Sequence, residues 1–391
     1  MRHSILGTIK YHIIPIIISL GLTVVVLSFV RNNITSRKVK KIEISGKQSY
    51  FKGYYANCEN NIQAEIELAG SLQNKDFITF LASSELSNSS PYIPYNFLPD
   101  SLNMPLLAFG HAHHQSFSIF CELLAMQKYL KGSKICIFLS PGWFESEGTN
   151  IEAFLEFARP NFLKSIIHNQ NINVSDKLEI KKFISSNINS IENPSKEINY
   201  FYHLNKSIKQ IRDCQDIIYK SKFPDVNYNV KILKNENKKL DYKWFDFKQR
   251  FTKTVLDSSS SNSYYILNSY YKTYLIDENG KYNHGETPKM DVKTNQELKD
   301  LKLLIKFLKQ NQCKASFIMQ ALNPYHYNNL KEFNPVMKEI KNTIESNNFP
   351  YLNMFVTEGK QFEPGILHDI MHTNDYGWMK INKFLYDTYK E

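Results

Sequence analysis

Three residue types that together can break an acyl bond occur in this chain at suggestive positions. Ser83 and Ser84 follow an apolar run, and Asp369 and His372 stand three residues apart near the C-terminus. A serine hydroxyl becomes a good nucleophile when a neighbouring base takes its proton. An aspartate that accepts a hydrogen bond from one ring nitrogen of a histidine aims the other nitrogen outward as that base. The pattern predicts acyl transfer or ester hydrolysis through a Ser–His–Asp triad.

Each part of this pattern also has a simpler explanation. Two serines at a strand end commonly form a turn or cap a helix, and an Asp-x-x-His spacing is common in solvated surface pairs. Ser83 and Ser84 are rival candidates for the nucleophile. Glu85 and Asp375 fit the first turns of helices, where a carboxylate interacts favourably with the helix dipole.

The elements that would position these residues alternate between strands and helices. Helical spacing is found over residues 117–130, 296–308 and 332–346 and from about Asn374 onward. Apolar runs typical of buried strands stand between and before these helices: 77–82, 104–109, 134–139, 315–320 and 351–355. This alternation predicts an α/β fold with a parallel sheet. Ligands bind beyond the carboxyl ends of such strands, so the loops that start at Ser83, Gly110 and Ser140 would share one rim.

The sheet pattern is interrupted between about residues 150 and 290. Helical stretches and tyrosine-rich polar connections fill this region. We interpret it as an insertion that forms a cap or side wall over the rim. Tyrosines such as Tyr264, Tyr265, Tyr270 and Tyr271 could line a groove there, or half-bury against the core.

The N-terminal region has the length and composition of a membrane anchor. Residues 13–30 form an unbroken uncharged run, long enough to cross a bilayer. We divide the chain into an anchor (1–31), a connector (32–75) and a catalytic domain (76–391). The basic residues that follow the span would keep the C-terminal side in the cytoplasm, although a long folded domain can cross despite such charges.

Charge and cysteine content narrow the class of partner. The net charge of +10 over 391 residues indicates an anionic neighbour. Because no arginine-rich tract or zinc spacing indicates nucleic acid, an envelope polymer or a membrane surface fits better. The five cysteines are scattered and form no Cys-x-x-Cys motif, so we predict no disulfide framework and no metal site.

Three motifs resemble one known family. Ala82–Leu86 (ASSEL) is similar to the G-S-S-E-L of the DltD family, D-alanyl transfer proteins of Gram-positive envelopes that are grouped with SGNH/GDSL esterase-like proteins. Ser140–Phe144 (SPGWF) resembles that family's S-P-x-W-F. Asp369–His372 with Gly377 and Trp378 resembles its D-x-x-H…G-W ending. The resemblance covers nearly the whole chain and is weakest over residues 150–290.

The resemblance implies an SGNH-hydrolase-like, flavodoxin-like three-layer fold with a five-stranded parallel sheet, a helical insertion and one N-terminal transmembrane helix. It implies Ser84 as the nucleophile, because Ser84 matches the catalytic position of the motif, and leaves Ser83 as a turn residue that forms hydrogen bonds. It also implies His372 as the general base and then acid, and Asp369 as the residue that fixes the tautomer of His372. The backbone N–H groups of Ser84 and Gly110 would donate to the oxyanion. The domain would lie outside the cytoplasm, on a single-pass anchor in the cell membrane.

The resemblance also implies a reaction and its partners. D-alanyl groups would pass through an acyl-Ser84 intermediate onto a teichoic acid-like anionic polymer. A membrane-bound O-acyltransferase (DltB-like) would be the partner, and an acyl carrier protein another, with no cofactor and no nucleic acid. Two other hypotheses about the function stay open. One is an envelope acyltransferase or esterase with another acyl group. The other is a non-catalytic adaptor that presents a carrier protein or polymer to a membrane acyltransferase.

Two departures from the family pattern matter. The first, at Ala82, would tighten the turn without removing the nucleophile. The second, at Gly142, concerns the oxyanion, because many esterases of the wider group have an Asn or similar donor on the loop after the third strand. Ala82 stands where the family has glycine, and Gly142 carries no side chain to donate a hydrogen bond. The backbone or Gln115 could substitute as a donor, and Gln115 and Trp143 are our candidate substrate contacts, although packing at the rim also explains Trp143.

The segment 111–114 carries three histidines, which suggests a metal site. Three histidines within four residues cannot readily all point inward. We therefore expect His111, His113 and His114 to be rim residues that contact an anionic substrate, and we predict no bound metal.

Overall fold

The computed structural model describes residues 18–19, 22, 42–45, 62–87, 90–110, 112–145, 148–158, 160–204, 230–233, 257–287 and 290–390. All but three residues of the predicted anchor lie outside these ranges, as do His111 and most of the connector. Among the described residues, no helix has the length and apolar character needed to cross a bilayer. The membrane anchor therefore stays a prediction.

A five-stranded, fully parallel sheet forms the centre of the described structure. Its order is β3-β2-β4-β6-β7, so the strand that precedes the two serines has neighbours on both sides. The bounds are β2 (Ile78–Ala82), β3 (Leu106–Gly110), β4 (Lys134–Leu139), β6 (Lys314–Met319) and β7 (Tyr351–Asn353). The register pairs Ala82 with Gly110 and Leu139 with Met319, which places the ends of β2 and β3 together at the same rim as those of β4 and β6. The predicted five-stranded parallel sheet is confirmed.

The strands are continuous apolar runs because both faces of the sheet are covered. Alternate residues of β2 belong to different hydrophobic clusters: Leu81 packs on one side, and Phe80 and Ala82 pack on the other. This alternation follows from the two-residue period of a strand. The core is therefore two separate layers with the sheet between them.

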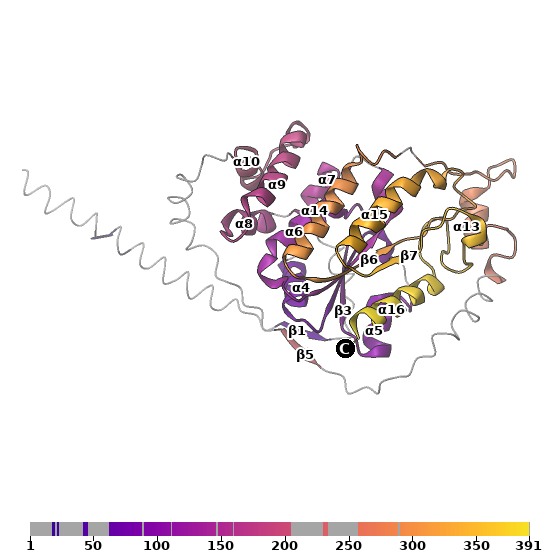
Figure 1. Cartoon of the computed structure of the whole chain (residues 1–391), viewed down its shortest axis with the longest axis horizontal. Helices are drawn as coiled ribbons and strands as arrows, with labels where there is room; N and C mark the ends of the chain where they lie inside the picture. Colours follow the sequence, from indigo (N-terminus) through magenta and orange to yellow (C-terminus); the bar gives the residue numbers. More distant parts are fainter. Residues whose placement is uncertain are drawn as a thin grey trace, which may run out of the picture.

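Helices cover each of these faces (Figure 1). One layer contains α4, α6, α14 and α15, and the other contains α5 and α16, which contact each other. The bounds are α4 (Ile62–Gln73), α5 (Pro94–Leu102), α6 (Ser116–Ala125), α14 (Gln296–Gln310), α15 (Asn334–Ser346) and α16 (Asp375–Tyr389). Since α4 packs on β2 and β3, this layer begins within the range predicted as connector. Asp375 lies in the first turn of α16, as expected.

The predicted insertion begins with four helices. They are α7 (Ile151–Phe157), α8 (Pro160–His168), α9 (Val174–Asn187) and α10 (Lys196–Tyr202). Among these helices, α7 and α8 pack on α6. Two short strands outside the main sheet pair in parallel, β1 (Ile42–Ser45) with β5 (Val230–Leu233).

The remaining elements are short and lie mostly in loops. The second part of the insertion contains α13 (Asn268–Tyr270) and a π-helical turn, η6 (Tyr271–Leu275). The 3-10 turns are η2 (Ser84–Ser87), η3 (Gln127–Tyr129), η4 (Pro141–Glu145), η5 (Ile188–Ser190), η7 (Leu330–Phe333) and η8 (Gly359–Gln361). η2 and η4 directly follow β2 and β4, at the rim.

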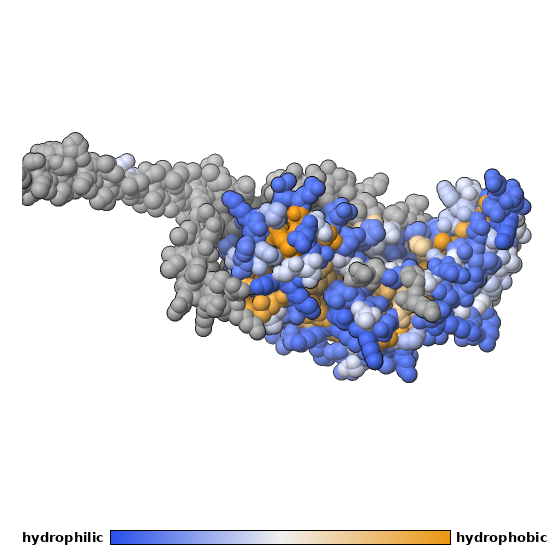
Figure 2. All heavy atoms as spheres, turned by 90° about the horizontal axis from the view of Figure 1, so that it is seen from above, coloured by the Kyte–Doolittle hydropathy of each residue, from blue (hydrophilic) through white to orange (hydrophobic). Residues whose placement is uncertain are grey.

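The face of the molecule in Figure 2 is predominantly hydrophilic, and its hydrophobic residues form small separate groups. The large apolar side chains are mostly inside: Trp378, for example, is fully buried and packs edge-on against Phe138 of β4, with ring centroids 5.7 Å apart. Gly377 allows α16 to lie close to the loop that precedes it, because a Cβ there would lie 2.5 Å from the carbonyl oxygen of Ile366. The Gly-Trp motif thus fixes α16, and the loop that precedes it, against the sheet.

Candidate active site

The two serines lie in a tight turn at the end of β2. Ser83 is buried, its Oγ accepts a hydrogen bond from the backbone N–H of Ser84 at 2.6 Å, and its own N–H donates to Oε2 of Glu85 at 3.1 Å. Ser84 is half-buried and begins η2. Ser83 is therefore the turn residue that the sequence predicted, and Ser84 is the more accessible of the two hydroxyls.

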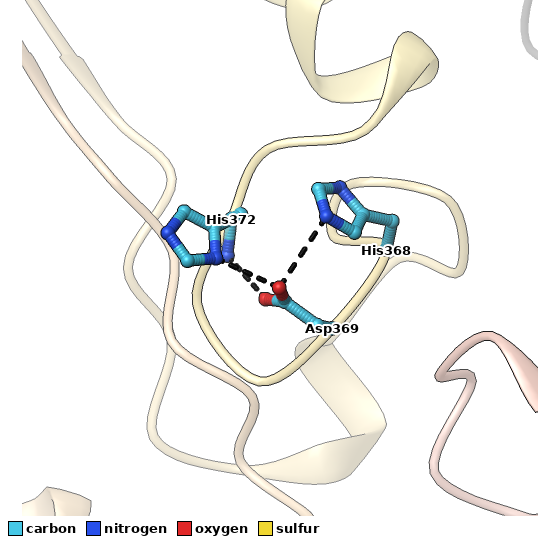
Figure 3. Close-up of side chains that lie close together, drawn as sticks. All are labelled: His368, Asp369 and His372. Carbon is cyan, nitrogen blue, oxygen red and sulfur yellow. Dashed lines mark hydrogen bonds and ion pairs between the residues drawn. The ribbon is translucent and has the colours of Figure 1, made fainter. Parts of the chain in front are cut away.

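The Asp-x-x-His segment forms a compact hydrogen-bonded loop (Figure 3). Nδ1 of His372 lies 2.7 Å from Oδ2 of Asp369, and Oδ1 of Asp369 accepts from the backbone N–H groups of Met371 and His372 at 2.8 and 2.6 Å. Asp369 is 4% exposed. Because Nδ1 donates to the carboxylate, Nε2 of His372 is the nitrogen that can accept a proton, which is the arrangement a triad requires.

Electrostatics around this pair favour an ionised Asp369 and a more basic His372. Burial raises the pKa of Asp369, but hydrogen bonds from His368 and His372 outweigh it and hold the pKa below its ordinary value. The hydrogen bond to Asp369 raises the pKa of His372 above 6.5, against the effect of burial. The negative charges of Asp369 and Glu85 add to the increase.

The charges of Glu85 and His372 also link the serine turn with the Asp–His loop. The charge of His372 lowers the pKa of Glu85, and the charge of Glu85 raises that of His372. Burial, the largest effect on Glu85, raises the pKa of this carboxyl. Glu85 is next to Ser84 in sequence, so the serine turn and the Asp–His loop lie close enough for their charges to interact.

The Asp–His loop is attached to several elements far from it in sequence. The backbone N–H of Asn323 donates to the carbonyl of Ile370 at 3.0 Å, and that of Leu267 donates to the carbonyl of His368 at 3.0 Å. The side-chain amide of Gln320, just after β6, donates to the carbonyl of Met371. These contacts hold the loop beside the carboxyl end of β6.

Of the two predicted oxyanion donors, one is engaged and the other is closely packed. The N–H of Ser84 donates to Ser83 Oγ, so Ser83 must rotate before that N–H can serve an oxyanion. A Cβ on Gly110 would lie 2.0 Å from the carbonyl oxygen of Ala82. Only glycine allows the ends of β2 and β3 to approach this closely.

The two candidate substrate contacts lie inside the protein. Gln115 and Trp143 are 6% and 5% exposed, and the Gln115 amide donates to the carbonyl of Trp143 at 3.3 Å. This bond joins the loops that follow β3 and β4. The low exposure and this hydrogen bond indicate that both side chains pack inside the protein, and they add no support for a direct contact with substrate.

The expectation of a histidine-lined rim is wrong for His114. His114 is fully buried, and both of its ring nitrogens face protein atoms. His113 is exposed and has a left-handed backbone conformation, with φ of 65°. The polar local sequence misleads because the partners of His114 come from β2 and α6, which only the tertiary fold brings together.

Sequence reasoning missed His368 and part of the polar surroundings. Nε2 of His368 lies 3.3 Å from Oδ2 of Asp369, so two imidazoles share one carboxylate (Figure 3). Burial raises the pKa of Glu145 to about 7, and the charges of Glu145 and Asp369 both act on Tyr327. Glu145 directly follows the SPGWF motif, and this position in the sequence could have identified it as a residue of the site.

One group of donor atoms among the described residues could in principle hold a metal ion. The ligand atoms of His368, Asp369 and His372 all lie within 4.8 Å of one another. Imidazole nitrogen and carboxylate oxygen suit zinc. In the geometry described here, the same atoms hydrogen-bond to each other, as a triad base and its acid do.

Comparison with known proteins shows the family of the chain. The family model for the DltD protein matches residues 57–390. The chain belongs to the DltD family. It is also similar to Protein DltD of Bacillus subtilis (strain 168), with 22% identity over 400 residues that cover 97% of this chain and 96% of the relative. Membership of the DltD family connects the chain with the cell envelope and with D-alanylation of teichoic acid.

Proposed function

We propose that this DltD-family chain is a serine acyltransferase that carries a D-alanyl group on Ser84 and delivers it to a teichoic acid. The observation that carries the proposal is the Asp369–His372 pair, buried at its carboxylate and bonded at 2.7 Å, beside the turn that bears Ser84. Structural pairs of this kind occur without catalysis, but this one lies where the carboxyl ends of parallel strands place ligands.

In the first half-reaction, Ser84 Oγ attacks the carbonyl carbon of an acyl ester or thioester and its proton passes to Nε2 of His372. The negative charge on the former carbonyl oxygen is stabilised by backbone N–H groups, with Gly110 as the first candidate. Collapse of this intermediate breaks the bond to the leaving group, which takes the proton from His372. Asp369 stabilises the imidazolium and does not itself take the proton.

In the second half-reaction, a hydroxyl of the acceptor replaces the leaving group. His372 takes the hydroxyl proton, the oxygen attacks the acyl-Ser84 carbonyl, and the proton returns to Ser84 as the ester bond to the enzyme breaks. A polyphosphate acceptor suits the net charge of +10. We further propose a single-pass anchor over residues 13–30 with the domain outside the cytoplasm, where it would meet a DltB-like membrane acyltransferase and the polymer.

The proposal is tested by trapping the intermediate. Full-length protein, purified with its membrane partner, is supplied with D-alanyl donor without acceptor, and intact-mass and peptide analysis locate the adduct. We expect an added alanyl mass on Ser84 that disappears in Ser84→Ala. Cells that carry Ser84→Ala should lose D-alanyl esters on their polymer. Normal esterification in those cells would contradict the proposal and favour an adaptor that presents a carrier or polymer.

A further inference from the structure

A second imidazole–carboxylate pair lies behind the nucleophile turn, and the reaction above does not use it. Nδ1 of His114 is 3.0 Å from the carbonyl oxygen of Ala82, and Nε2 is 3.0 Å from Oε2 of Glu122 in α6. Both side chains are 0% exposed. The ring of Phe157 in α7 stacks on the imidazole, with centroids 4.4 Å apart and planes 25° apart.

The partners dictate where the protons are. A carbonyl oxygen only accepts, so Nδ1 of His114 carries a hydrogen and donates it to Ala82. The contact between Nε2 and the Glu122 carboxyl oxygen is a hydrogen bond whichever atom holds the proton. Buried polar groups are retained where their hydrogen bonds are satisfied, and here both nitrogens are. The imidazole is thus fixed in position by two hydrogen bonds and a stacked ring.

The carbonyl that accepts from His114 lies between the serine turn and Gly110. Ala82 is the last residue of β2, and Ser84 follows two residues later. The same carbonyl oxygen is the atom that excludes a side chain at Gly110. Gly110 is the last residue of β3, and His114 lies in the loop that follows it. The hydrogen bond from His114 and the close approach of Gly110 to the same oxygen therefore connect the nucleophile turn with the predicted oxyanion donor.

We propose that the buried His114–Glu122 pair is a positioning device, which fixes the Ala82 carbonyl and thereby the placement of Ser84 relative to the N–H of Gly110. This role rests on the proposed acyl-Ser84 chemistry. His114 does not touch substrate, because it is sealed between Ala82, Glu122 and Phe157. A misplacement of about 1 Å between reacting groups can cost about a hundredfold in rate, so such a device acts on the chemical step.

The test compares full-length variants in their reaction with a serine-directed fluorophosphonate. His114→Phe keeps a ring against Phe157 but removes both hydrogen bonds. His114→Asn keeps a donor near the position of Nδ1, and His114→Leu has nearly the shape of Asn without the donor. For each variant, the maximal labelling rate, the probe concentration at half that rate, the pH profile and the melting temperature are measured.

We expect His114→Phe to label Ser84 about tenfold to a hundredfold more slowly, with little change in the half-saturating probe concentration. His114→Asn should regain most of the rate, and the pH midpoint should stay that of the wild-type protein. If His114→Phe does not fold, the test is the comparison of the other two variants: His114→Asn should label faster than His114→Leu.

Three results overturn the proposal, and they differ from a failure of the proposed function. A folded His114→Phe that labels at the wild-type rate would remove the positioning role alone. Equal rates for Asn and Leu would do the same. A shifted pH midpoint would place His114 in the proton relay instead. A wild-type protein that does not label at Ser84 would overturn the proposed function and this role together.

Discussion

His372 with Asp369 and His114 with Glu122 are two imidazole–carboxylate pairs of similar length, 2.7 and 3.0 Å, in different surroundings. The His372 side chain is 36% exposed and the His114 side chain is 0% exposed. Nδ1 of His372 donates to its carboxylate, which leaves Nε2 to exchange a proton. Both nitrogens of His114 are bound to protein atoms. The partner of the second nitrogen, together with exposure, therefore separates the two proposed roles: His372 can exchange a proton, and His114 can hold a backbone carbonyl.

The largest expected effect separates the two carboxylates through matched amide variants. Asp369→Asn should lower acyl transfer by about ten-thousandfold, because the amide favours the wrong tautomer of the histidine. Glu122→Gln should cost less than about tenfold, since a side-chain amide can accept a hydrogen bond from Nε2 of His114 or donate one to it. The measurement is kcat/KM for transfer to the acceptor polymer. Similar losses in the two variants would contradict the different roles of the two pairs.

A second prediction concerns the close packing that His114 and Gly110 share at Ala82. Gly110→Ala should lower the free energy of unfolding by about 1–3 kcal/mol, because its Cβ has no room beside the Ala82 carbonyl. Gly142→Ala is the control: its Cβ meets only Ser140 Oγ, at 3.8 Å. Urea unfolding followed by circular dichroism compares them. Equal stabilities would show that β2 and β3 approach less closely than described.

A third prediction uses pH to distinguish the pairs. Labelling of Ser84 requires neutral His372, so the rate should fall as the pH decreases through the raised pKa of His372, which lies above 6.5. Glu85→Gln removes a charge that raises this pKa, so the midpoint should move to lower pH by less than about one unit. Glu122→Gln should leave the midpoint unchanged. A midpoint that follows Glu122 and not Glu85 would reverse the roles of the two pairs.

The smallest expected effect is at His368. His368→Gln keeps a donor within reach of Asp369 and should slow acyl transfer only about twofold to fivefold, the loss of roughly 0.5–1 kcal/mol. His368→Leu should cost more, because the carboxylate loses one of its two imidazole neighbours. Steady-state rates of the two variants provide the measurement. A loss as large as that of His372→Ala would make His368 the base.

Local patterns were sufficient to predict the sheet segments. The run 134–139 is β4 to the residue, and 77–82 differs from β2 by one residue, because buried parallel strands are continuous apolar runs. The strand order was not predictable, since it depends on pairing across long separations. The predicted connector hid α4, whose apolar residues, such as Leu68 and Leu72, are buried against the sheet.

The candidate site was predictable where a motif is local and not where its partners are distant. Asp369 and His372 bond each other within one loop, so their spacing carried the information. His114 was misplaced because Ala82 and Glu122, which bury it, lie 32 and 8 residues away in sequence. His368 escaped notice although it is next to Asp369, because only the folded loop turns its ring toward the carboxylate.

The most direct test of the central claim is covalent labelling of the full-length protein with a fluorophosphonate, mapped by peptide mass spectrometry, with His372→Ala as control. The account predicts one adduct on Ser84 that is absent from the control. An adduct on Ser83, an adduct that persists without His372, or no adduct on folded protein would contradict it.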